Sequence, residues 1–108
     1  MHNKTQKKRT WPSRIFLYST PRTAQAKAYK YLGRTAKLYP GTVANKKYSV
    51  YDKKNNRWVN FGQMGYEDYT KHHDKARRKN YLRRSGLIKG DWAGNRYSAN
   101  NLARNILW

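Results

Sequence analysis

The side chains able to do chemistry gather in the second half of the chain. Four of the five acidic residues lie between Glu67 and Asp91, and the adjacent pair His72-His73 lies among them. Neighbouring carboxylates such as Glu67 and Asp68 point about 100° apart on a helix, so they cannot readily share one substrate as acid and base. Neighbouring histidines diverge in the same way and do not converge on one metal ion. The sequence therefore predicts no enzyme, no cofactor, no metal site and no small-molecule substrate.

A run of cations follows this acidic pair and is the strongest functional signal. It places seven positive side chains within fourteen residues, and only Asp74 offsets them. A solvated helix face is the alternative interpretation, but such faces usually mix signs, so the run favours contact with a polyanion or an acidic protein. The seven are Lys71, Lys75, Arg77, Arg78, Lys79, Arg83 and Arg84.

Aromatic residues interleave with these cations. Tyr69 and Tyr81 invite a base-stacking interpretation, as in proteins that bind single strands. The chain has only 15 Leu, Ile, Val and Phe residues against ten Tyr and four Trp, so tyrosine must fill part of the interior. A core role is therefore the favoured interpretation of both tyrosines.

Composition predicts one small domain with a thin core. The chain has 108 residues, 25 Lys and Arg, 5 Asp and Glu, and a formal net charge of +20. It has no cysteine, so no disulfide or thiolate metal site can stabilise it, and a partner must do so. Charge of this density makes nucleic acid, an anionic membrane surface or an acidic protein the expected neighbour. No apolar run approaches a membrane span, and Met1 to Arg9 lacks the apolar region of a signal peptide.

The predicted elements fall into two parts of the chain, with a boundary near residue 44. Residues 1–44 are predicted to be a basic N-terminal arm, extended at Met1 to Thr10, with a short strand at Ile15 to Tyr18 and a helix from Pro21 to Leu38. The cations of the extended part are Lys4, Lys7, Lys8 and Arg9.

Residues 45–108 are predicted to form a hairpin-plus-helix module. Two runs, 46–52 and 57–61, flank a four-residue turn, with Tyr48 and Val50 on one face. A helix is expected over 67–85, with its acids in the first turn and an Asp74–Arg78 pair. A terminal helix capped by Ser98 follows, and its apolar stripe is Ala99, Leu102, Ala103, Ile106 and Leu107. The predicted fold class is α+β.

Three blocks in this module carry a resemblance to a known family. They are FGQMGYEDYTKHHDKARRKNYLRR at 61–84, IKGDW at 88–92 and YSANNLARNILW at 97–108. These blocks resemble small basic virion-associated proteins of giant nucleocytoplasmic large DNA viruses. The resemblance covers about 60% of the chain, and it implies a virion protein assembled inside the host cell.

Two functions explain the charge. The resemblance favours a minor capsid component that bridges or cements major and minor capsid proteins and the inner shell or membrane. In that case Trp11, Trp58, Trp92 and Trp108 would anchor in adjoining subunits. The alternative is sequence-independent nucleic-acid binding or genome condensation through the 71–84 helix and the arm. An RNA-binding module is a third class, which no motif supports.

Overall fold

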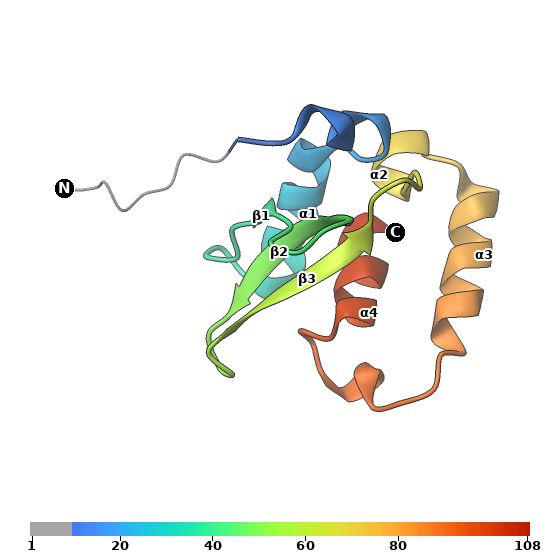
Figure 1. The fold of residues 1–108 in the computed structure, drawn as a ribbon. Coiled ribbons are helices and arrows are strands. Elements are labelled where there is room, and N and C mark those ends of the chain that lie inside the picture. The colour runs from blue at the N-terminus through green and yellow to red at the C-terminus, as the bar shows by residue number, and fades with distance from the viewer. Residues whose placement is uncertain (1–9) are drawn as a thin grey trace.

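A three-stranded antiparallel sheet is formed by the middle of the chain in the computed structural model, which describes residues 10–108 (Figure 1). The strand order is β1-β2-β3, with helices before and after the sheet, which confirms the α+β class. The arm cations Lys4, Lys7, Lys8 and Arg9 lie outside the described residues. In chain order the elements are η1 (Ser13–Leu17), α1 (Pro21–Leu32), β1 (Tyr39–Pro40), β2 (Lys46–Asp52), β3 (Arg57–Gln63), α2 (Tyr69–His72), α3 (Lys75–Gly86), η2 (Trp92–Gly94), α4 (Ala99–Leu102) and η3 (Ala103–Leu107).

The predicted hairpin is confirmed as β2 and β3. Tyr48 pairs with Phe61, and both side chains are buried on the face toward the helices. The turn at 53–56 lies where its composition predicts it. β3 continues two residues beyond its predicted end, because Lys46 still pairs with Gln63.

The edge strand β1 is absent from the sequence prediction. Tyr39 pairs with Ser49 and Pro40 with Tyr48. Proline has no backbone N–H to donate to a neighbouring strand, so it usually argues against a strand. An edge strand tolerates it, because one side of that strand is unpaired. The Ser49 hydroxyl donates to the Pro40 carbonyl at 2.9 Å, which fastens this edge to β2.

One hydrophobic core spans the predicted boundary at residue 44. Tyr48 and Phe61 enter it from the sheet, and Ile15 and Leu38 enter it from the preceding segment. The division into an arm over 1–44 and a separate module is therefore wrong for the described residues. A core combines segments that are distant in sequence. The part of the chain before residue 44 has too few apolar residues for the sequence alone to show that it belongs to the core.

The predicted strand at Ile15 to Tyr18 is wrong. These residues belong to the 3₁₀-helix η1 and its end, where the Tyr18 and Ser19 N–H groups donate to the Ile15 carbonyl at 3.0 and 2.9 Å. Phe16 and Leu17 are exposed, Ile15 is fully buried in the core, and Tyr18 is partly buried against it. An apolar run this short does not distinguish a strand from a helical turn.

Helix α1 begins at Pro21 as predicted but ends at Leu32, six residues before the predicted end at Leu38. Gly33 follows with φ +115°, a backbone conformation that terminates the helix and that glycine adopts without strain. The chain then runs back along α1. The Gln25 side chain donates to the Ala36 carbonyl and accepts from the Leu38 N–H, each at 2.9 Å.

The predicted helix over 67–85 is two helices, α2 and α3. His73 adopts the left-handed conformation at φ 56° and ends α2. Asp74 then caps α3 by accepting from the Ala76 and Arg77 N–H groups, so its carboxylate serves the helix end and makes no ion pair with Arg78. The acids Glu67 and Asp68 precede α2 instead of occupying its first turn.

The C-terminal helix is confirmed with one exception. The Ser98 hydroxyl accepts from the Asn101 N–H at 3.2 Å, which is the predicted cap. Leu102, Ile106 and Leu107 are fully buried and Ala103 nearly so, whereas Ala99 is exposed. From Ala103 onward the helix widens into the π-helical segment η3.

Candidate polyanion-binding helix

Helix α3 lies at the periphery of the molecule, with α4 between it and the sheet (Figure 1). Its only buried residue is Ser85. A helix with so little buried surface does not owe its composition to the core, because burial of an apolar face is what normally stabilises a helix in a protein. Most of its side chains are therefore exposed to solvent.

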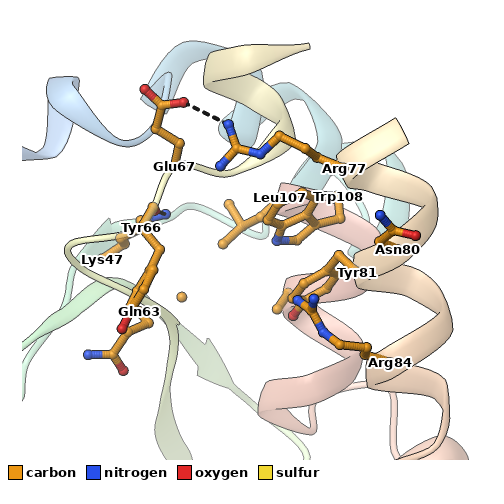
Figure 2. Close-up of a pocket in the computed structure, with 12 residues that line it drawn as sticks. Lys47, Gln63, Tyr66, Glu67, Arg77, Asn80, Tyr81, Arg84, Leu107 and Trp108 are labelled. Atoms are coloured by element: carbon orange, nitrogen blue, oxygen red, sulfur yellow. Dashed lines mark hydrogen bonds and ion pairs between the residues drawn. The ribbon is translucent and has the colours of Figure 1, made fainter. Parts of the chain in front are cut away.

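The cations of α3 divide between two faces. Arg77 and Arg84 point toward the body of the protein (Figure 2). Lys75, Lys79 and Arg83 lie on the opposite side, since successive residues turn about 100° around a helix. We call these three residues the outer stripe. Like charges four residues apart repel, at about 0.2–0.5 kcal/mol for each pair, so the stripe costs stability in the isolated chain.

The outer stripe is uncompensated within the described residues. Its three side chains are exposed and make no hydrogen bond or ion pair with residues 10–108. Arg77 differs, because it pairs with Glu67 at 3.2 Å. Arg78 also differs, since its Nε donates to the Trp108 main-chain oxygen at 2.6 Å.

Contacts with the C-terminal segment hold α3 in place. The Tyr81 ring stacks on the Trp108 indole with centroids 4.3 Å apart and planes 9° apart. The Arg104 guanidinium donates to the Leu82 carbonyl and the Ser85 hydroxyl, both at 2.6 Å. The outer stripe is thus presented by a fixed helix.

A cavity of about 420 Å³ separates α3 from the sheet (Figure 2). Its apolar wall includes Leu107 and Trp108, and its polar wall includes Gln63, Asn80 and Arg84. The cavity lies on the inner face of α3, and none of the three outer-stripe residues lines it.

A buried polar network fixes the base of this region. Lys47 and Asp68 form an ion pair at 3.0 Å, with side chains 3% and 1% exposed. The Lys47 ammonium also donates to the Tyr66 carbonyl at 2.6 Å, and burial lowers the pKa of Lys47. Asp68 in turn accepts from the Thr70 N–H and hydroxyl. Lys47 lines the cavity but its charge is already matched, so it is not a ligand-binding cation.

Tyr48 joins this network from the core. Its hydroxyl bonds to the Ser19 hydroxyl at 2.6 Å, and Ser19 bonds to Thr70 at 3.1 Å. Burial raises the pKa of Tyr48 well above the usual value near 10.

We expect the protein to lose stability at alkaline pH through Tyr48. Above about pH 10 the unfolded chain releases the phenol proton while the folded chain keeps it, so the free energy of unfolding falls by up to about 1.4 kcal/mol per pH unit. Below that pH the contribution of Tyr48 is fully present. Denaturant unfolding at pH 9, 10 and 11 measures the decline, and Tyr48→Phe should flatten it. Parallel declines in the two proteins would contradict this assignment.

The two histidines lie at the junction of α2 and α3, where His73 ends α2. His72 Nδ1 accepts from the Asp74 N–H at 2.9 Å. Burial, with the nearby Arg77 charge, lowers the pKa of His72, which keeps the ring neutral and able to accept. Within residues 10–108 no three His, Cys, Asp or Glu side chains are grouped as a metal site would require.

A family profile matches the part of the chain that contains the sheet and most of α3. The profile of a family of unknown function (DUF5754) matches residues 36–85. No curated protein and no solved structure matches the chain. The matched stretch runs from the residues before β1 to the last turn of α3, so it contains the sheet, all seven cations of the 71–84 run and Trp58.

Three of the four predicted tryptophan anchors lie outside the DUF5754 match, and all three make contacts within the chain. Trp11 packs edge-on against Tyr48, with centroids 5.4 Å apart. Trp92 donates to the Ile88 carbonyl at 2.6 Å, and Trp108 stacks on Tyr81. Of the four tryptophans only Trp58 is about half exposed, at 47%. Trp11, Trp92 and Trp108 are mostly buried within their own chain and have little surface left for an adjoining subunit.

The two tyrosines of the basic region also pack internally. Tyr81 contacts Trp108, and the Tyr69 ring lies 6.0 Å from the His72 and His73 rings, with the Arg78 guanidinium 5.5 Å from its centroid. Both tyrosines are partly buried, but neither belongs to the hydrophobic core or to the residues packed against it, so their predicted core role is not confirmed. Among residues 10–108 no helix has the length and apolar character needed to cross a membrane.

Proposed function

We propose that this protein is a virion structural protein, a minor capsid component that cements neighbouring capsid proteins. The observation that supports the proposal is the outer stripe, Lys75, Lys79 and Arg83, which a fixed helix presents without a compensating acid among the described residues. An acidic face of a capsid subunit complements such a stripe and fixes its orientation. The resemblance to virion-associated proteins supports a capsid protein as this acidic partner.

The same charges also suit a nucleic acid, which is the second candidate. The net charge of +20 favours it, because phosphate neutralisation drives binding without regard to sequence. The two functions differ in salt dependence. If the stripe binds duplex DNA, the logarithm of the binding constant should fall steeply and linearly with the logarithm of the salt concentration. A capsid component needs only weak affinity for DNA.

Incorporation into particles tests the proposal. The triple variant Lys75→Gln/Lys79→Gln/Arg83→Gln should be incorporated roughly tenfold less than the wild type, if each exposed charge contact contributes about 0.5 kcal/mol. The matched control removes three exposed cations from the α1 side, Arg22→Gln/Lys30→Gln/Arg34→Gln, and lowers the net charge equally. Quantitative mass spectrometry of purified particles gives the copy number of each. Equal loss in the two variants would mean that total charge, and not the stripe, recruits the protein.

A further inference from the structure

A cluster of three aromatic rings lies on the face of the sheet opposite the core. Tyr39, Tyr51 and Trp58 contribute one ring from each strand. The Trp58 ring lies 5.5 Å from Tyr39 at 85° and 5.4 Å from Tyr51 at 62°. Both tyrosines contact the indole in edge-to-face geometry, so its orientation is set before any partner arrives.

Strand alternation places this cluster outward. Tyr48 and Val50 point into the core, so Ser49 and Tyr51 between and after them point to the other face. Tyr51 and Trp58 are direct partners across β2 and β3. The small Ser49 side chain leaves room for the Tyr39 ring to reach across it to Trp58. The hairpin turn beside the cluster extends to the edge of the molecule, far from α3 (Figure 1).

Two lysines and no carboxylate line a hollow beside the cluster. A hollow of about 260 Å³ is lined by the three rings, Tyr97, Lys37 and Lys53, and no carboxylate is among its lining residues. The Lys37 ammonium lies 5.8 Å from the Tyr39 ring centroid. The nearest acid in sequence, Asp52, is buried on the core face and accepts from the Asn55 side chain at 2.8 Å.

We propose that this face is a stacking site for unpaired bases of a single-stranded nucleic acid, with Trp58 as the platform and Lys37 and Lys53 as phosphate contacts. A half-exposed, pre-oriented indole offers a π-face to any base, and adjacent lysines follow the backbone. A duplex hides its base faces and gains nothing from the ring. The absence of an acid from the lining of the hollow favours a polyanion over a protein, whose surface would bring both signs. This inference does not rest on the proposed function.

Binding of a fluorescein-labelled twelve-residue oligothymidylate by the full chain, measured by anisotropy, tests the proposal. Trp58→Ala should weaken binding roughly 5- to 150-fold, which is the usual effect of removing one stacking ring. Trp58→Phe should keep most of the affinity, because it keeps a π-face. The matched control is Phe16→Ala, which removes an aromatic ring of similar exposure, 50%, from η1.

Salt titration separates stacking from charge. Trp58→Ala should lower affinity at every salt concentration without changing the slope of log K against log salt, and Lys37→Gln/Lys53→Gln should make the slope shallower. Unfolding curves of each variant confirm that the fold is kept. Trp58→Ala that binds the oligonucleotide as tightly as the wild type would overturn the proposal. Equal dependence on Trp58 for a duplex of the same length would overturn it as well.

Discussion

Asp68→Ala should destabilise the protein by about 3–5 kcal/mol, because it leaves the Lys47 ammonium buried without its counter-charge. The Lys47 side chain is 3% exposed, so water cannot replace the lost carboxylate. The substitution also removes the acceptor that caps α2 through the Thr70 N–H. Against the 5–15 kcal/mol typical of small domains, this loss is a large part of the total. Equilibrium urea unfolding measures it.

The neighbouring residue provides a matched control. Glu67 also pairs with a cation, Arg77, but the two side chains are 40% and 50% exposed. Glu67→Ala should therefore cost at most about 1 kcal/mol. The double variant Lys47→Met/Asp68→Asn should recover part of the stability lost in Asp68→Ala, because it buries no charge. If Asp68→Ala lowers the free energy of unfolding no more than Glu67→Ala does, the claim that the buried Lys47–Asp68 ion pair stabilises the start of α2 is contradicted.

Trp108→Ala should release α3 from the body of the protein. The Tyr81–Trp108 stack is the main aromatic contact of this otherwise exposed helix. Loss of the aromatic pair and of its buried area removes about 2 kcal/mol. Amide hydrogen exchange within 75–86 should then accelerate roughly 30-fold, while the strands β2 and β3 keep most of their protection.

A conservative variant distinguishes stacking from other effects of the substitution. Trp108→Phe retains an aromatic face for Tyr81 and should keep exchange in α3 near that of the wild type. Arg78 should not decide the result, because it contacts the main-chain oxygen of residue 108, which both variants retain. Equal acceleration of α3 and of the sheet in Trp108→Ala would show that the stack supports the whole fold and not α3 alone.

Local signals predicted part of this fold. The hairpin, the start of α1 at Pro21 and the Ser98 cap each depend on residues close together in sequence, and each is found. The split between α2 and α3 was not predicted, because no Gly or Pro marks the left-handed turn at His73 and because Asp74 was interpreted as an ion-pair partner of Arg78 and not as a helix cap. β1 was not predicted because its two residues form a strand only beside β2.

The candidate site was predicted in composition but not in geometry. Counting cations over 71–84 located the basic helix, yet only the structure separates Lys75, Lys79 and Arg83 from Arg78, whose partner Trp108 lies 30 residues away. The same holds for the tryptophans. Sequence patterns do not show which indoles contact their own chain, so Trp58 could not be told apart from Trp11, Trp92 and Trp108.

Fractionation of opened particles tests the proposed capsid role most directly. Purified particles are opened gently, divided between nuclease and high salt, and separated on a density gradient, and quantitative mass spectrometry then follows this protein and the major capsid protein. The account predicts that the protein stays with the emptied shells after both treatments. Its release with the genome, or by nuclease while the shells remain assembled, would contradict a capsid role and assign the outer stripe to nucleic acid.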